Sequence, residues 1–301
     1  MRVYRSGSQW VVHSPGKLNL FFEVLGERED GYHEIETLVY PIDLYDTLYF
    51  KEDSTGRVTI GCETTVGLRW TSGLGSSRLP TGADNLAVRA VLLLRRRAGV
   101  RHGARMRLVK RIPSAAGLGG GSSDAAAALV AANRCWRLGW SRSELARVGA
   151  EVGSDVPLFL AQGPAVCRGR GERVEVVCGV GMLHFVVVRP PGGLSTAEVY
   201  RACGPIGDRR RLQPLIDALT RGHLARAGSL FFNRLQPAAS TLSPWIDQLR
   251  GRFERLDVWG HQMTGSGTCY FGLCRHGRQA RRLASTFQAR GWTAWAVRGC
   301  R

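Results

Sequence analysis

A glycine-rich turn between residues 117 and 123 carries the strongest chemical signal in the chain. Its sequence, GLGGGSS, follows an apolar run that ends at Ile112 and precedes an alanine-rich stretch typical of a helix. Glycines allow positive φ angles and leave room for a ligand against the backbone. The first turn of the following helix offers unpaired N–H groups at the positive end of its dipole. The sequence therefore predicts a phosphate-binding site.

This turn matches neither of the two common nucleotide-binding glycine motifs. No Gly-Lys-Ser/Thr closes it as in a Walker A loop, and Ser122 takes the place of the last glycine of a dinucleotide-binding fingerprint. The alternative is a structural turn with a Ser/Asp helix cap. The hydroxyls of Ser122 and Ser123 could cap the helix, contact a phosphate oxygen or hold Mg²⁺.

Five segments, in order along the chain, resemble the signatures of the GHMP kinase superfamily. The second of them resembles the stretch that marks its diphosphocytidyl-methylerythritol kinase branch. Together they carry the resemblance from about residue 11 to the C-terminus, and their common order makes it specific. The segments are SPGKLNL (14–20), DGYHEIETL (30–38), PSAAGLGGGSSDAA (113–126), GSDVPLF (153–159) and TGSGTC (264–269).

The resemblance implies an α+β fold of two lobes and a small-molecule kinase that uses ATP and Mg²⁺. The N-terminal, ATP-binding lobe (10–165) would be similar to the ribosomal S5 domain 2-like fold, and the C-terminal lobe (166–301) would be ferredoxin-like. The expected reaction is phosphorylation of the 2-hydroxyl of a diphosphocytidyl-methylerythritol, a step of non-mevalonate isoprenoid precursor biosynthesis. The expected partners are this substrate and ATP, with no specific nucleic acid and no membrane, in a cytoplasmic monomer or homodimer.

Two residues match the catalytic pair of the family. Asp155 would orient the substrate hydroxyl and accept its proton, and Lys17 would keep Asp155 ionised and stabilise charge on the transferred group. Taken alone, a lysine at position 17 is more often a solvated surface residue, and the alternative role of Asp155 is a helix N-cap.

The resemblance also assigns residues to the two ligands. Asn85 and Lys110 match positions on the adenine side of ATP, although a helix N-terminal residue and an exposed strand lysine are the alternatives. Ser123 is in addition a candidate Mg²⁺ ligand. The rest of the predicted ATP site is Pro113, Ala115, Ala116, Gly117, Leu118, Gly119, Gly120, Gly121, Ser122 and Ser123. The predicted substrate site is Asn19, Tyr32, His33, Thr196, Gly265, Ser266 and Gly267.

Three features depart from the family pattern. Gly16 stands where alanine is common, and Ser114-Ala115-Ala116 replaces a more glycine-rich start of the phosphate loop, which predicts a stiffer mouth. The stretch from Gly67 to Thr81 resembles an insertion, and its position suggests a flap.

The elements that must position these residues alternate irregularly between strands and helices, which favours α+β architecture with antiparallel sheets. Asp30-Gly31 is a turn between strand-like runs. Asp84 is expected to cap a helix that stops at Gly99, and Gly61 to Pro80 to form a long loop. Predicted strands cover 10–13, 18–25, 37–39, 47–50, 105–112, 174–177 and 185–188, and predicted helices cover 124–133, 143–152, 212–227, 244–253 and 276–290, with another starting near Asp155.

Composition limits the other classes of function. The N-terminus reads as a frayed leader, no run is long enough to cross a bilayer, and the cysteine spacing predicts reduced thiols and no zinc site. A net charge of +18 attracts polyanions, so a basic nucleic-acid-binding protein is one alternative. A GHMP kinase for another small alcohol, such as homoserine or mevalonate, is the other.

Overall fold

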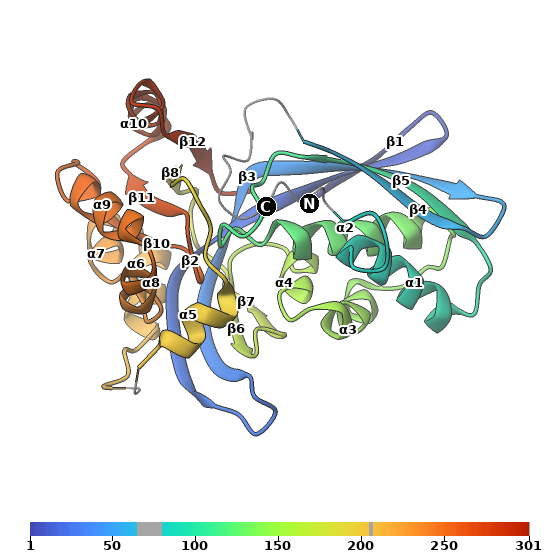
Figure 1. The fold of residues 1–301 in the computed structure, drawn as a ribbon, viewed down its shortest axis with the longest axis horizontal. Helices are drawn as coiled ribbons and strands as arrows, with labels where there is room; N and C mark the ends of the chain where they lie inside the picture. The colour runs from blue at the N-terminus through green and yellow to red at the C-terminus, as the bar shows by residue number, and fades with distance from the viewer. Residues whose placement is uncertain (65–79, 205–206, 301) are drawn as a thin grey trace.

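The computed structural model describes residues 1–64, 80–204 and 207–300, which form two lobes lying side by side (Figure 1). The strands of the first sheet are β1 (Arg2–Ser6), β2 (Gln9–Glu27), β3 (His33–Asp53), β4 (Val58–Thr64), β5 (Gly103–Lys110), β6 (Ala165–Gly169), β7 (Arg173–Val176) and β9 (Phe232–Asn233). Its main order is β1-β2-β3-β5-β4; β6 adds to β3, β7 to β6 and β9 to β2. The pairings are antiparallel except β4 with β5 and β9 with β2.

Four helices cover one face of this sheet: α1 (Leu86–Ala98), α2 (Gly120–Cys135), α3 (Arg142–Val152) and α4 (Val156–Leu160) (Figure 1). The central helix is α2, whose alanines at 125–128 are all fully buried. Small side chains let the sheet and the neighbouring helices approach this helix closely. The position of α2 fixes the glycine-rich turn that precedes it.

The second lobe is a four-stranded antiparallel sheet with helices packed on it. Its core follows from the alternation of side chains along β8. Phe185 and Val187 face the apolar residues of β2, whereas Val186 and Val188 pack with the residues of α9 and α10. The elements are β8 (His184–Arg189), α5 (Thr196–Ala202), α6 (Gln213–Thr220), α7 (Leu224–Ser229), α8 (Gln236–Leu242), α9 (Pro244–Phe253), β10 (Gly260–Met263), β11 (Tyr270–Cys274), α10 (Gly277–Ala289) and β12 (Thr293–Arg298), with sheet order β10-β11-β8-β12.

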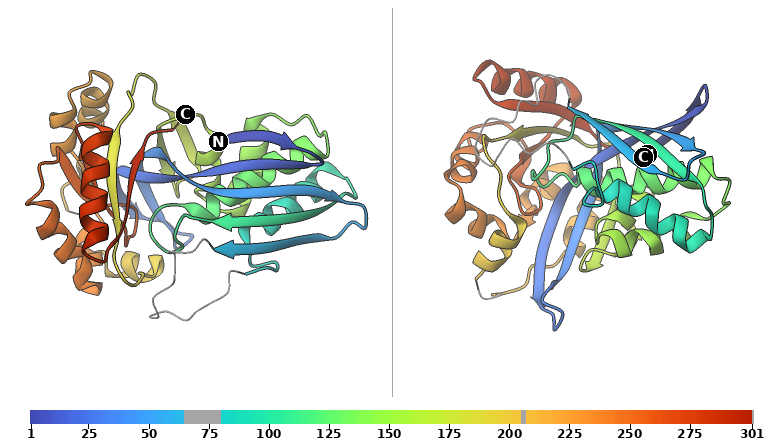
Figure 2. Two further views of the ribbon diagram at one scale, coloured as in Figure 1. Left: turned by 90° about the horizontal axis from the view of Figure 1, so that it is seen from above. Right: turned by 45° about the vertical axis from the view of Figure 1, so that its right-hand side comes forward.

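Strand β2 belongs to the cores of both lobes. Val12 packs under the first-lobe helices, Leu18 and Leu20 pack between the two sheets, and Val24 packs with the second-lobe helices. Strands β2 and β3 form a long hairpin that projects beyond the other elements (Figure 2). Strand β3 contributes to the same three clusters, so the β2–β3 hairpin joins the two lobes.

Several expected elements are confirmed. The α+β class, the Asp30-Gly31 turn, α2, α3, α9 and α10 all lie where the sequence predicts them, within a few residues. Helix α1 ends at Gly99, whose φ of 65° suits glycine. No helix of the described part of the chain is long and apolar enough to cross a membrane.

Other expectations are corrected. The N-terminus is not frayed, because β1 pairs with β2. Asn85, not Asp84, caps α1. The helix expected at 212–227 is two helices, α6 and α7, separated by a turn at Gly222 with a φ of 73°. Gly61 to Thr64, expected in a loop, belong to β4, and most of the Gly67–Thr81 stretch lies outside the described residues.

The predicted lobe boundary between residues 165 and 166 also needs correction. It falls inside β6, which pairs with β3 and with β7. The first sheet therefore continues to Val176 before the chain enters the second lobe. The predicted boundary ends the first sheet too early, because short strands such as β6 and β7 carry little periodicity.

Candidate active site

A cavity of about 970 Å³ is lined by residues of both lobes. Its walls come from β2, the β2–β3 hairpin, the glycine-rich turn, the turn before α4, α5 and the turn after β10. The cavity collects most of the predicted site residues: Lys17, Asn19, Tyr32, His33, Pro113, Ala115, Ala116, Gly117, Leu118, Gly119, Gly120, Gly121, Ser122, Asp155, Thr196, Gly265, Ser266 and Gly267.

The glycine-rich turn needs glycine at two positions, because each has a positive φ and a neighbour where a Cβ atom would lie. Gly117 has a φ of 73°, and a Cβ atom there would lie 2.0 Å from the carbonyl oxygen of Thr264. Gly119 has a φ of 69°, and its Cβ would lie 2.9 Å from Phe159. Ala115, in the same turn, also has a positive φ of 49°. An alanine in this conformation is strained, so Ala115 restricts the backbone at the start of the glycine-rich turn.

The start of α2 presents the predicted phosphate-binding surface. Gly119 occupies the N-cap position, and Gly120, Gly121 and Ser122 begin the helix and line the cavity. The N–H groups of a first helical turn have no acceptor within the helix. No acidic residue lies in this turn to compete for them. The arrangement is suited to bind an anion.

Lys17 lies on β2 beneath this turn and is almost completely buried. Its ammonium donates a hydrogen bond to Oδ1 of Asn19 at 2.5 Å. Burial lowers the pKa of Lys17, and the negative charge of Asp155 opposes that change. The result is a cation held in a dry part of the cavity, where its charge is only weakly screened.

Asp155 is half-buried at the first turn of α4. It occupies the N-cap position but makes no side-chain cap hydrogen bond. The alternative role as a helix cap is therefore not seen. Instead, its Oδ1 lies 3.2 Å from the place of a Cβ on Gly171, a residue with a φ of 118°, so the backbone approaches the carboxylate closely there. The side chain is available to a ligand.

Aromatic and basic side chains gather at the hairpin end of the cavity. The ring of His33 lies 4.8 Å from that of Tyr200 on α5. The guanidinium of Arg170 lies over the ring of Tyr32 at 5.0 Å. Arg201 also lines this end. Flat rings and positive charges can bind a planar base that carries phosphate groups.

The second lobe closes the other side of the cavity through two hydroxyl groups. The Oγ1 atom of Thr196 lies 2.9 Å from the Oγ atom of Ser266, which links α5 to the turn after β10. Both residues were predicted to contact substrate, and both line the cavity. The contact ties together two segments that are far apart in sequence.

Lys110 does not line the cavity. It is buried, forms an ion pair with Asp46, and donates to Oδ2 of Asp124 at 2.6 Å. Ser14 donates to the other oxygen of Asp124 at 2.8 Å. The alternative of an exposed lysine is therefore wrong, while the contact with ATP stays a prediction. Lys110 instead joins β3, β5 and α2 beneath the glycine-rich turn.

Asn85 also lies outside the cavity wall, and it has the alternative role of a residue at a helix N-terminus. Its side chain caps α1 by accepting from the amide of Ala87 at 2.9 Å, and its amide group donates to the carbonyl of Pro80 at 2.8 Å. The neighbouring residue Leu86 lines the cavity in its place. The prediction that Asn85 contacts ATP has no support in this geometry.

Ser123 is the third predicted residue outside the cavity. Its side chain is fully buried, and its hydroxyl has no hydrogen-bond partner among the described residues. The described part of the chain also contains no group of three or more His, Cys, Asp or Glu side chains suited to a metal ion. These residues do not form a cage for a resident Mg²⁺, and of the two serines at the start of α2 it is Ser122 that lines the cavity.

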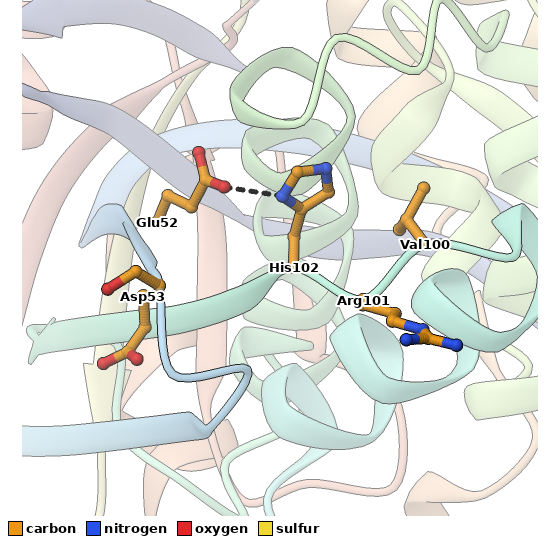
Figure 3. A pocket seen from close by; sticks show the side chains of 6 residues that line it. Glu52, Asp53, Val100, Arg101 and His102 are labelled. Carbon is orange, nitrogen blue, oxygen red and sulfur yellow. Dashed lines mark hydrogen bonds and ion pairs between the residues drawn. The ribbon is translucent and has the colours of Figure 1, made fainter.

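A second, smaller hollow of about 360 Å³ lies between the β3–β4 turn and the link from α1 to β5 (Figure 3). Glu52 contacts His102 there at 2.6 Å. Both side chains are largely exposed, and none of the predicted site residues lies nearby. The chemistry therefore belongs to the larger cavity.

Comparison with known proteins decides the family. The sequence model of the GHMP kinases N terminal domain matches residues 85–163, and that of the GHMP kinases C terminal matches 215–291. A 4-diphosphocytidyl-2-C-methyl-D-erythritol kinase of Pelotomaculum thermopropionicum is 40% identical over 90% of this chain and 91% of its own. One of Shouchella clausii is 34% identical over 96% of this chain and 94% of its own.

The chain belongs to the GHMP kinases. Its structure agrees: the crystal structure of a 4-(cytidine 5'-diphospho)-2C-methyl-D-erythritol kinase superposes with a TM-score of 0.77 at 35% identity, over 97% of this chain and all of that one. A homoserine kinase from Cytophaga hutchinsonii has a TM-score of 0.73 at 17% identity, over 99% of this chain and 96% of that one, which shows a shared fold alone. This GHMP kinase is a small-molecule kinase of two lobes.

Among the cavity residues of this GHMP kinase that its sequence did not identify, Arg170, Tyr200 and Arg201 supply an aromatic ring and positive charge. Arg170 follows β6, and the other two lie on α5, a short helix that was not predicted. No local pattern marks them, because their role depends on the packing of α5 against the hairpin. The proximity of Tyr200 to Thr196, one turn earlier on the same helix, was the available signal.

Proposed function

We propose that this kinase transfers the γ-phosphate of ATP to the 2-hydroxyl of 4-diphosphocytidyl-2-C-methyl-D-erythritol, in the non-mevalonate route to isoprenoid precursors. One observation carries the proposal. The cavity presents a helix N-terminus suited to phosphates next to Lys17 and Asp155, with the aromatic residues Tyr32, His33 and Tyr200 at its other end. The relatives that match most of the chain are kinases of this substrate, which supports the proposal.

The step follows from these positions. The 2-hydroxyl oxygen forms a bond to the γ-phosphorus while the bond from that phosphorus to the oxygen bridging it to the β-phosphate breaks, and ADP leaves. Asp155 orients the hydroxyl and takes its proton. Lys17 stabilises the negative charge on the transferred phosphoryl group, and the N–H groups at the start of α2 hold the remaining phosphates. A loose transition state asks for positioning more than for a strong base.

Magnesium enters this proposal as part of the substrate, the Mg–ATP complex. Bound Mg²⁺ neutralises charge on the phosphates. The hydroxyl of Ser122 lines the cavity at the start of α2 and could bind the ion there. A cytoplasmic location and a monomeric or homodimeric state stay predictions.

The base end of the cavity supports a cytidine substrate over a small alcohol. We expect the ring of the cytosine to stack between aromatic side chains and its edge to meet His33. We expect Arg170 and Arg201 to lie near the diphosphate. Homoserine and mevalonate have neither group, so this end of the cavity would have no ligand in a kinase for those substrates.

A coupled assay of ADP release tests the proposed function. Purified protein with Mg–ATP is given the cytidine substrate, homoserine or mevalonate in parallel. We expect turnover with the cytidine substrate alone, and ³¹P NMR should show a new phosphomonoester on it. Turnover only with another alcohol would refute the substrate. Salt-sensitive binding to duplex DNA or RNA without any turnover would favour the nucleic-acid alternative.

A further inference from the structure

A buried threonine behind the cavity wall contacts the two segments that carry the chemistry. Thr264 follows β10 in the second lobe, is fully buried and does not line the cavity. Its hydroxyl accepts a hydrogen bond from the backbone N–H of Asn19 at 3.0 Å. The same oxygen lies 3.2 Å from Oδ1 of Asn19 and 3.2 Å from the carbonyl oxygen of Gly117. The one hydroxyl proton is therefore directed at these two acceptors.

The side chain of Asn19 is held from both ends. Its Nδ2 donates to Oγ1 of Thr37 at 2.9 Å, and that hydroxyl donates to the carbonyl of Phe21 at 2.6 Å. Because the hydroxyl of Thr37 donates its one proton to that carbonyl, it can only act as an acceptor toward Asn19. The amide oxygen of Asn19 must then point the other way, toward Lys17 and Thr264. The orientation of this amide is fixed by hydrogen bonds.

The same residue fixes the glycine-rich turn. The carbonyl of Thr264 occupies the space where a Cβ of Gly117 would lie, and its hydroxyl faces the carbonyl of Gly117. The backbone N–H of Cys269 donates to the carbonyl of Ala116 at 3.2 Å, close to the same point. The second lobe therefore contacts β2 and the glycine-rich turn through one short segment.

We infer that Thr264 is a positioning residue that sets Lys17, through Asn19, against the glycine-rich turn. The inference rests on the proposed function, in which Lys17 stabilises the transferred phosphoryl group. Lys17 has three N–H groups, and the described residues give its ammonium one hydrogen bond, to Asn19. Asp155 acts on the same ammonium through its negative charge. A loose Asn19 would leave Lys17 without its fixed partner.

The test compares Thr264→Val, Thr264→Ser and Thr47→Val. Valine keeps the shape of threonine and removes the hydroxyl, and serine keeps the hydroxyl. Thr47 is the matched control, because it is also buried, on β3, and its hydroxyl accepts from Arg111 at 2.8 Å away from the cavity. Any general cost of burying a valine in place of a hydrogen-bonded threonine appears in both valine variants.

We expect Thr264→Val to lower kcat about 10- to 100-fold, since a small displacement of a reacting group has effects of that size. Thr264→Ser should stay within about threefold of wild type, because the hydroxyl is retained. The fall of kcat at high pH should move to lower pH in Thr264→Val, since Lys17 has lost a fixed acceptor. Thr47→Val should keep both the wild-type kcat and its pH profile.

A second readout does not depend on turnover. Hydrogen exchange of a peptide that contains Asn19 should be faster in Thr264→Val than in wild type or Thr47→Val, because the backbone N–H of Asn19 has lost its acceptor. Unchanged exchange, or an unchanged kcat with faster exchange, would overturn the inference. If wild-type protein fails to phosphorylate the cytidine substrate, the proposed function fails, and the kinetic comparison is made with the alcohol that is turned over.

Discussion

The ammonium of Lys17 donates its hydrogen bond to the amide oxygen of Asn19, 2.5 Å away, while Asp155 acts on the same lysine through charge. The two groups of the predicted catalytic pair are therefore held by different elements, β2 and the first turn of α4. Because the two side chains come from different elements, each role can be tested by itself.

Asp155→Asn is expected to lower kcat by about 10²- to 10⁴-fold, the usual contribution of a general base. The KM for ATP should change little, because the phosphates bind at α2. Steady-state kinetics with a coupled ADP assay measure both. Asp84→Asn is the control, since Asp84 is exposed and lies outside the cavity. Near-wild-type turnover of Asp155→Asn would remove Asp155 from the mechanism.

The pH dependence of turnover should report Lys17. Burial lowers the pKa of Lys17 from its ordinary value of 10.5. The charged form is the active one, so kcat should fall as pH rises, with a midpoint below 10.5. A profile of kcat against pH, with the coupling enzymes in excess at each pH, measures this. A midpoint at or above that of a free lysine would contradict the assignment.

Lys17→Met should separate activity from stability. A buried cation costs desolvation energy, so its replacement by an apolar side chain of similar length should raise the free energy of unfolding, by roughly 0.5–2 kcal/mol, while turnover is lost. Urea denaturation at pH 7 measures the first and the coupled assay the second. If the variant were instead less stable than wild type, the buried Lys17 cation would stabilise the fold, and the expectation that it lowers stability would be wrong.

Two glycine substitutions in the same turn should have opposite effects on stability. Gly117 has a left-handed backbone conformation, and Gly117→Ala places a Cβ 2.0 Å from the carbonyl oxygen of Thr264. We therefore expect the free energy of unfolding to fall by roughly 2–3 kcal/mol. Gly121 lies in α2, and Gly121→Ala places its Cβ at an ordinary contact distance of 3.6 Å from Leu86. We expect this variant to raise the free energy of unfolding by roughly 0.5–1 kcal/mol. Thermal unfolding compares them. Equal effects would mean that the turn relaxes around Gly117.

Tyr200→Ala is expected to raise the KM for the cytidine substrate by about 5- to 100-fold, because stacking on an aromatic ring contributes roughly 1–3 kcal/mol per base. The KM for ATP should stay the same, since Tyr200 lies at the hairpin end of the cavity with His33. The exposed residue Tyr4 provides the control as Tyr4→Ala. An equal change in both KM values would indicate a general loss of structure.

The sequence predicted the parts of this kinase that depend on local order. The glycine-rich turn, the alanine helix and the Pro244 helix start are short-range features, and the structure has all of them. The environment of Lys110 was predicted wrongly because Asp46, its buried partner, lies 64 residues away in sequence. Tyr200 was missed, and the burial of Ser123 was not foreseen, for the same reason. Which face of a helix or strand meets a cavity depends on tertiary packing.

The long strand β2 has a mechanical consequence. Since its side chains belong to the cores of both lobes, a hinge between the lobes would have to bend this strand and disturb three packed interiors at once. Opening and closing around ligands must then fall to the rim, namely the hairpin tip with Tyr32 and the α5 segment joined to it. We therefore expect the part of β2 that carries Lys17 to move less than this rim when ligands enter and leave.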